Sequence, residues 1–245
     1  MTLKGFYPGW LRIPDKRDFK YRIDRTIPVQ KKSDLTHLFP KCWDQGQAGT
    51  CFAFGTIGLV WADRVIQGLP VFESSPLMLA YLVSVMEHSI GQDAGGSPRD
   101  AIKALIKVGV CSEDEWPYDI TKLGTKPSFR CYMDAQKHEL LKYSRAITLT
   151  QIRACLSSGY PCGLGFMVYE NFPMDSTDGI VPMPEGGEEG GHYTVAVGHD
   201  DYLQRIKFRN SWGGGWGDGG YGYLPYAYFS PYRTGDHFTV RRMEL

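Results

Sequence analysis

The sequence lacks several features that would assign it to a particular class of protein. It has no apolar run of about 18 residues that could span a bilayer, and its first residues lack the apolar core of a signal peptide. Lysine and arginine together number 27, as do aspartate and glutamate, so no excess charge favours nucleic acid or an anionic membrane as partner. We expect a soluble monomer that binds neither, and the sequence leaves its compartment open.

Cysteine is also sparse, with six in 245 residues and no Cys-x-x-Cys pair. This density is far below that of scaffolds built on disulfides, and zinc sites usually draw on close cysteine pairs. We therefore expect neither a structural metal nor a cofactor. Cys111 and Cys131 lie 20 residues apart, and the sequence leaves open whether they form a disulfide or remain two separate buried thiols.

The first half of the chain carries helical patterns. Apolar residues at three- and four-residue steps predict a buried helix over about residues 50–66, and a second helical stretch covers roughly 76–87. A third helix should begin with Ser97 as its cap and Pro98 in its first turn, and end at Gly109.

The second half changes character after the helical stretch "LTQIRACLSSG". We expect strands in "YPCGLGFMVY", "HYTVAVGHD" and "LQRIKFRNSW", and a flexible loop in "PMPEGGEEGG". The pattern predicts an α+β fold, with an N-terminal segment at residues 1–26, a mainly helical lobe at 27–137 and a mainly β lobe at 138–245. A ligand site is expected in the cleft between the lobes.

Cys51 stands where a loop containing Gly46 and Gly49 meets the start of the first predicted helix. Its sulfur would lie near the positive end of the helix dipole, which favours the thiolate, and an imidazole nearby would strengthen this effect. His192 follows four glycines and opens a predicted strand, whereas the other histidines are expected to be structural. Antiparallel pairing of that strand with the next would bring Asn210 beside His192, where it could orient the ring.

Three motifs on these elements together resemble the papain-like cysteine peptidases. "DQGQAGTCFAF" is similar to the family's block around its nucleophile, "GGHYTVAVG" to its histidine strand and "RNSWGGGWGDGGY" to its asparagine block. The separation of Cys51 and His192 also falls in the range of roughly 130–150 residues quoted for this family. The resemblance implies a papain-like two-lobe fold, with the nucleophile helix in a helical left lobe, an antiparallel β-barrel-like right lobe, and the active-site cleft between them.

The resemblance implies a peptidase that cleaves peptide or protein substrates through a thioester. By position it assigns Cys51 as nucleophile, His192 as base and acid, Asn210 as orienting group and Gln45 as oxyanion donor. It also implies residues that contact the substrate or shield the site: Gly49, Gly95, Gly96, Pro98, Gly191 and Trp212. No inserted loop with paired histidines is evident, so we expect an endopeptidase.

The sequence departs from the family pattern around the nucleophile. Ala48 stands where many relatives have a cysteine, and "GQDAGG" lacks the cysteine with which it would pair, so the resemblance implies that this disulfide is absent. The family usually carries a long helical pro-segment, and we expect none here, because only about 26 residues precede the stretch that resembles the start of the mature enzyme. The short N-terminal segment carries Phe6, Tyr7 and Trp10, and either covers the cleft and inhibits the enzyme or packs away from it.

Two other functions compete with peptide hydrolysis. A Cys-His-Asn site could also run acyl transfer or deamidation of glutamine. A peptide-binding protein derived from a peptidase would be expected to have lost Cys51, His192 or Gln45, and all three are present.

Overall fold

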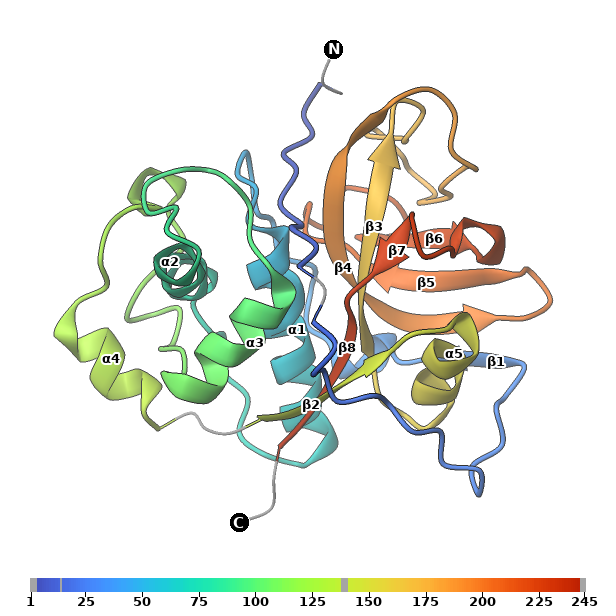
Figure 1. Cartoon of the computed structure of the whole chain (residues 1–245), viewed down its shortest axis with the longest axis horizontal. Coiled ribbons are helices and arrows are strands. Elements are labelled where there is room, and N and C mark those ends of the chain that lie inside the picture. Colours follow the sequence, from blue (N-terminus) through green and yellow to red (C-terminus); the bar gives the residue numbers. More distant parts are fainter. Residues whose placement is uncertain (1–3, 14, 138–140, 243–245) are drawn as a thin grey trace.

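The computed structural model of the chain describes residues 4–13, 15–137 and 141–242. Helices and strands gather on two sides of the molecule, and the N-terminal residues run down between them (Figure 1). The helical side is made of α1 (Cys51–Ile66), α2 (Pro76–Met86), α3 (Pro98–Lys107), η2 (Ile120–Lys122) and α4 (Phe129–Ala135). None of the described helices is long and apolar enough to cross a membrane.

The other side is built on a six-stranded antiparallel sheet in the order β6-β5-β4-β3-β7, with β1 also paired to β4. Its elements are β1 (Lys32–Asp34), η1 (Thr36–Leu38), α5 (Leu149–Ser157), β3 (Cys162–Tyr169), β4 (Glu188–Asp200), β5 (Arg205–Arg209), β6 (Tyr221–Pro225), η3 (Tyr226–Tyr228) and β7 (Thr234–Gly235). A second antiparallel pair joins β2 (Leu141–Ala146) to β8 (His237–Arg242).

The three helices predicted in the first half lie within a residue or two of their expected bounds, and Ser97 is the N-cap residue of α3 as predicted, but the bounds of the predicted loop are wrong. Ser97 occupies the N-cap position of α3 without a capping bond from its side chain, and its N–H donates instead to Glu87 Oε1 at 2.8 Å. The predicted flexible loop ends early, because β4 already begins at Glu188 and pairs with β3. His237 is a buried residue of β8, in keeping with a structural role.

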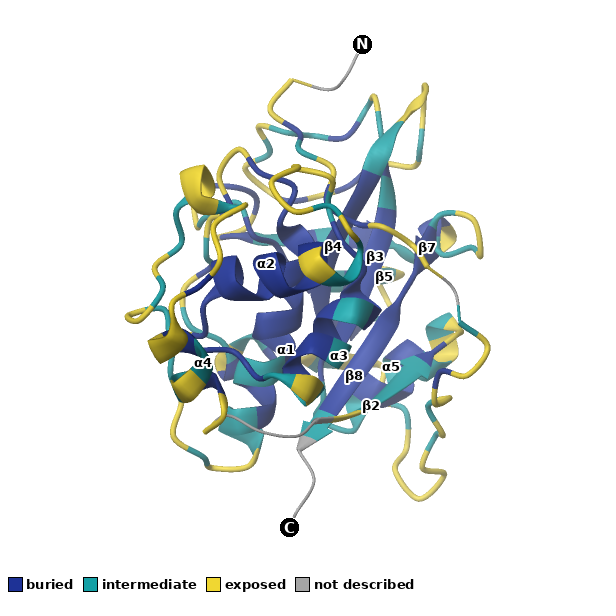
Figure 2. Ribbon diagram, turned by 60° about the vertical axis from the view of Figure 1, so that its left-hand side comes forward, coloured by how far each residue is buried: buried dark blue, intermediate teal, exposed yellow. Residues whose placement is uncertain are grey.

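Helix α1 packs directly against β4, which brings the two sides together. A Cβ atom at Gly55 would lie 2.6 Å from the Tyr193 ring, and one at Gly58 would lie 3.3 Å from Val195. Glycine at position 55 therefore allows a close approach that a larger residue would prevent, whereas a Cβ at position 58 would require only a small shift of Val195. Figure 2 shows buried residues concentrated in α1, β4 and β8 at the centre of the molecule.

The later part of the N-terminal segment is built into the fold. Phe19 accepts a backbone hydrogen bond from Arg145 at 2.7 Å, and Tyr21 donates one to Arg145 at 2.9 Å. The buried carboxylate of Asp18 accepts from Arg99 Nε at 2.7 Å and from Arg145 Nη1 at 2.8 Å. Residues 18–21 thus tie the N-terminal segment to α3 and β2.

We predict that Asp18→Ala lowers the free energy of unfolding by about 3–5 kcal/mol, because it leaves the Arg99 charge buried without a carboxylate. Urea unfolding measures this change. The control is Asp15→Ala, which removes the exposed ion pair with Arg17 from the same segment and should leave the unfolding midpoint unchanged. Equal midpoints for the two variants would contradict the structural role of residues 18–21.

Candidate active site

Cys51 is the first residue of α1 and is completely buried. The loop before it turns at Gly46, which has a φ of 58°, a conformation that favours glycine. The Cys51 sulfur accepts a hydrogen bond from the backbone N–H of Tyr193 at 3.3 Å. The thiol at the start of the helix therefore lies beside the residue that follows His192 on β4.

His192 is held by Asn210 and by aromatic rings. Its Nε2 atom lies 2.7 Å from Asn210 Oδ1, and Asn210 directly follows β5, which pairs antiparallel with β4. Trp212 stacks on the imidazole with a centroid separation of 4.7 Å and an interplanar angle of 28°, and the edge of Phe166 packs at 5.6 Å. The other ring nitrogen, Nδ1, is buried and has no hydrogen-bond partner among the described residues.

Burial keeps both groups neutral in this state of the protein. It raises the pKa of the Cys51 thiol to about 12, although backbone hydrogen bonds to the sulfur act to lower this pKa. It also lowers the pKa of His192 to about 4, opposed by the bond to Asn210. The start of a helix favours a thiolate, but removal from water outweighs that preference here, so the pair is a thiol and a neutral imidazole.

Gln45 is fixed by residues that the sequence did not single out. Its Oε1 atom accepts from Ser211 Oγ at 2.6 Å, its Nε2 donates to the Ala48 carbonyl at 2.8 Å, and its backbone carbonyl accepts from the Tyr118 hydroxyl at 2.8 Å. Ser211 lies directly after Asn210, so its place in the motif was a usable signal. Tyr118 is distant in the chain and carries no local signal.

Asp93 joins the nucleophile loop to the glycine-rich loop. Its Oδ1 atom accepts from the Gly49 N–H at 2.8 Å. Asp93 belongs to "GQDAGG" and Gly49 follows Ala48, so this hydrogen bond connects the two loops that lack a disulfide. All six cysteines are free thiols, including Cys111 and Cys131.

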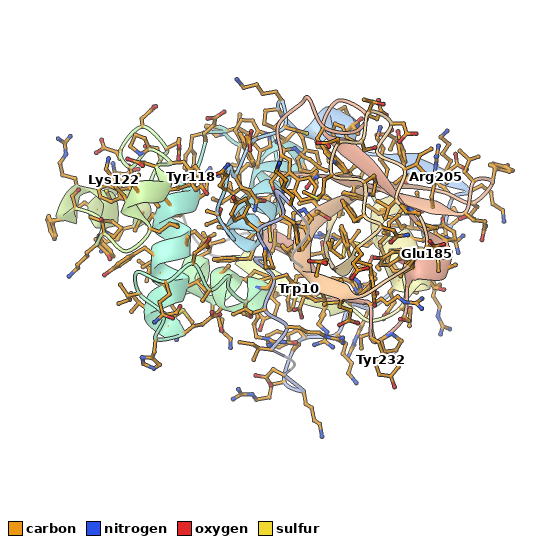
Figure 3. The ribbon with its side chains drawn as sticks, turned by 90° about the horizontal axis from the view of Figure 1, so that it is seen from above. Trp10, Tyr118, Lys122, Glu185, Arg205 and Tyr232 are labelled. Atoms are coloured by element: carbon orange, nitrogen blue, oxygen red, sulfur yellow. The ribbon has the colours of Figure 1, made fainter. Side chains whose placement is uncertain are left out.

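Residues 6–12 of the N-terminal segment, here called the cover, lie over the site. Gly9 and Trp10 both donate to the Gly191 carbonyl, at 3.0 and 3.1 Å, and Leu11 donates to the Gly96 carbonyl at 3.1 Å. A Cβ atom at Gly9 would lie 2.3 Å from the Gly49 oxygen and 2.7 Å from the Cys51 sulfur. Figure 3, which views the molecule from above, shows Trp10 between the helices and the sheet.

The residues expected to contact substrate lie in three places. Four of them touch the cover. A Cβ at Gly49 or Gly95 would collide with Pro8 or Gly9, and the carbonyls of Gly96 and Gly191 accept hydrogen bonds from the cover. Trp212 lies on the imidazole. Pro98 is a buried residue at the start of α3.

We next consider the titratable and metal-binding side chains of the described residues outside this site. No group of three His, Cys, Asp or Glu residues that could hold a metal ion occurs in the described part of the chain. His199, on the same strand as His192, lies near Ser157 and Tyr226 at 3.2 and 3.3 Å and 3.5 Å from Asp201, so it belongs to a separate network.

The site combines a cysteine at the start of a helix, a histidine on a strand and an asparagine at the end of the next strand. This arrangement can be compared with those of known protein families. A model described as papain family cysteine protease matches residues 30–228, and the chain belongs to this family. It is a papain-like cysteine peptidase, and the predicted two-lobe α+β fold is confirmed.

Three relatives give the scale of the similarity. Xylellain, a cysteine protease from Xylella fastidiosa, matches with a TM-score of 0.91 and 32% identity over 100% of this chain and 98% of its own. An uncharacterized peptidase C1-like protein of Acanthamoeba polyphaga mimivirus is 35% identical over 89% of this chain and 74% of its own length. A cathepsin B-like protein of Giardia intestinalis is 29% identical, over 86% and 68%.

The buried histidines predict how stability depends on pH. Burial lowers the pKa of His192 and of His237 to about 4, from 6.5 for an ordinary histidine. Between these values the unfolded chain binds protons that the folded chain does not, so the free energy of unfolding falls as the pH drops from 6.5 towards 4.

We predict that His192→Gln removes one of the groups that bind a proton on unfolding. The slope of the free energy of unfolding against pH should therefore decrease by up to about 1.4 kcal/mol per pH unit. Urea unfolding of the wild type and the variant at a series of pH values between these limits measures the two slopes. Identical slopes would show that His192 is not held neutral in the folded protein.

Proposed function

We propose that Cys51, His192, Asn210 and Gln45 hydrolyse internal peptide bonds, and that the cover keeps this site closed until it is displaced. The observation that carries the proposal is the hydrogen bond that the Cys51 sulfur, at the start of α1, accepts from the N–H of Tyr193, the residue directly after the His192 that Asn210 holds. These groups supply a nucleophile, a base and the group that orients the base.

The first half of the reaction requires the open cleft. Water that enters the open site lowers the free-energy cost of forming charged groups there. The thiol proton then passes from Sγ to Nδ1 of His192, the ring nitrogen that Asn210 does not hold. The thiolate attacks the peptide carbonyl, and the oxyanion is met by the Cys51 N–H and the Gln45 amide. Gln45 Nε2 carries two hydrogens and uses one on Ala48, so the other is free for the oxyanion.

The second half releases both products. His192 gives its proton to the leaving amine as the carbon–nitrogen bond breaks, which leaves the acyl group on sulfur as a thioester. His192 then takes a proton from water, and the resulting hydroxide adds to the thioester carbonyl. Collapse of that intermediate breaks the carbon–sulfur bond, frees the carboxylic acid and returns the thiol.

The path of the cover supports cleavage within a chain. The cover passes over the Cys51 sulfur at Gly9 and continues in both directions, with Phe6 packed near His192 and Trp212, at 6.1 and 6.4 Å between ring centroids, and Leu11 bonded to Gly96. A continuous polypeptide therefore fits on both sides of the nucleophile. This favours an endopeptidase over an enzyme that reads a chain end.

The cover resists attack by the site that it closes. The Gly9 N–H donates to the Gly191 carbonyl at 3.0 Å, and the Gly9 carbonyl accepts from the Gly96 N–H at 2.9 Å. The Gly9 carbonyl is thus bound to Gly96, and not to the Cys51 N–H and the Gln45 amide that would stabilise an oxyanion. We propose that substrates replace these contacts, with the same backbone groups of Gly96 and Gly191 binding the substrate main chain near Gly49 and Gly95.

We predict that Cys51→Ala lowers the rate of peptide hydrolysis by at least about 10⁴-fold, because it removes the nucleophile. Mass spectrometry of a peptide mixture gives the products: internal cleavage supports the proposal, whereas one-dalton shifts or crosslinks would indicate deamidation or acyl transfer. Cys111→Ala, which removes another buried thiol, serves as the control and should keep the wild-type rate.

The cover is tested by adding a single methyl group. In Gly9→Ala the new Cβ would collide with Gly49 and Cys51, so the cover should leave the cleft and the rate of peptide hydrolysis should rise at least about tenfold. Leu11→Ala is the matched control, since it trims a partly exposed side chain and keeps the backbone bonds of the cover. An unchanged rate in Gly9→Ala would show that the cover does not inhibit.

A further inference from the structure

Arg209 is a buried cation at the end of β5, directly before Asn210. Its side chain belongs to a residue that is only 3% exposed. Burial lowers the pKa of Arg209, although Cys42 and Tyr221 act to raise it, and neither of these is a carboxylate. Its Nη2 atom donates to the Lys41 carbonyl at 2.8 Å, and its Nε atom is buried without a hydrogen-bond partner among the described residues. A cation held in this way must be stabilised by other contacts.

Two aromatic rings supply these contacts. The central carbon of the Arg209 guanidinium lies 4.3 Å from the centroid of the Trp43 ring and 5.5 Å from that of Phe39. The face of an aromatic ring attracts a cation, and the attraction is stronger where water is excluded. Trp43 also packs on Trp61 of α1, with a centroid separation of 6.1 Å and an interplanar angle of 78°. The Trp43 ring therefore contacts both the end of β5 and the helix that begins at Cys51.

Trp43 and Gln45 belong to a short antiparallel ladder with the residues that follow β5. The Trp43 carbonyl accepts from the Gly213 N–H at 2.9 Å, and the Gln45 N–H donates to the Ser211 carbonyl at 2.8 Å. The side chains of Ser211 and Gln45 are also hydrogen-bonded, at 2.6 Å. The position of the Gln45 amide thus depends on the register of this ladder, and Trp43 anchors the start of the ladder on Arg209.

We propose that Arg209 is a positioning residue for the oxyanion site, acting on Gln45 through its contact with Trp43. The inference rests on the proposed function and deepens it. A hydrogen-bond donor accelerates the reaction only where it meets the oxygen that gains charge, and a displacement of about 1 Å can cost up to about 10²-fold in rate. Loss of the stacked guanidinium would loosen the ladder and move the Gln45 amide out of place.

The first experiment measures peptide hydrolysis by the full chain carrying Gly9→Ala, in which the cover should have left the cleft. Arg209→Met keeps an unbranched side chain and removes the charge and the planar group. It should lower kcat at least about tenfold and change KM less than about twofold, because the backbone groups assigned to substrate binding are untouched. Arg209→Lys keeps the charge and should lower kcat by a smaller factor.

The matched control is Arg205→Met. Arg205 lies at the other end of β5, with its guanidinium 4.2 Å from the centroid of the Tyr223 ring, so this variant removes the same kind of contact from the same strand. It should leave kcat unchanged. An unchanged kcat in Arg209→Met, or an equal loss in Arg205→Met, would overturn the inference and leave the proposed function standing.

The second experiment does not depend on hydrolysis. A peptide aldehyde reacts reversibly with the Cys51 thiol: the sulfur bonds to the carbonyl carbon, and the thiol proton passes to the oxygen, which then lies in the oxyanion site. The corresponding peptide alcohol binds without this bond. The ratio of the two affinities separates the oxyanion site from the rest of the cleft. Arg209→Met should lower this ratio at least about tenfold, and Arg205→Met should leave it unchanged.

The variant Gln45→Ala tests whether Arg209 acts through Gln45. Once the amide is gone, Arg209→Met should lower the affinity ratio no further, because both changes remove the same interaction. Arg209→Lys, the milder change, should lower the ratio at least about threefold and serves if Arg209→Met does not fold. A further fall in the Gln45→Ala chain, or an unchanged ratio in both Arg209 variants, would overturn the inference even if no peptide were cleaved, a result that would count separately against the proposed function.

Discussion

The site depends on the close contact between α1 and β4. Gly55 allows the helix to approach Tyr193 more closely than a residue with a Cβ would permit, and Gly58 packs closely on Val195. That approach places the Cys51 sulfur at the N–H of Tyr193 and therefore beside His192. Because one group comes from each lobe, any change that separates α1 from β4 would take the nucleophile away from its base.

The loops around this contact are held by hydrogen bonds instead of a disulfide. Asp93 accepts from Gly49, Ser211 donates to Gln45, and the Tyr118 hydroxyl bridges the Gln45 carbonyl and the Thr50 side chain. Each bond joins the nucleophile loop to a different segment, so Gln45 and Cys51 keep their relative positions. The free cysteines of this chain are consistent with a site whose shape does not depend on oxidation.

Much of this arrangement could be predicted from the sequence, because it is local or follows from strand pairing. The helix beginning at Cys51 follows from apolar periodicity, and the meeting of His192 and Asn210 follows from two adjacent antiparallel strands. The roles of Asp93 and Tyr118 could not be predicted, because each depends on contacts between segments far apart in the chain. The neutral state of Cys51 and His192 also escaped prediction, since it is caused by burial, which the helix-dipole argument does not include.

The N-terminal segment combines two roles that the sequence alone does not separate. Residues 18–21 are tied to α3 and β2 around the buried Asp18 carboxylate, whereas the cover lies on the groups that we assign to catalysis. The most direct test of the account is a crystal structure of the full chain after reaction with a thiol-directed epoxide. We predict an adduct on Cys51, with residues 8–11 displaced and residues 18–21 in place. An adduct on another cysteine, or on Cys51 beneath an undisturbed cover, would contradict it.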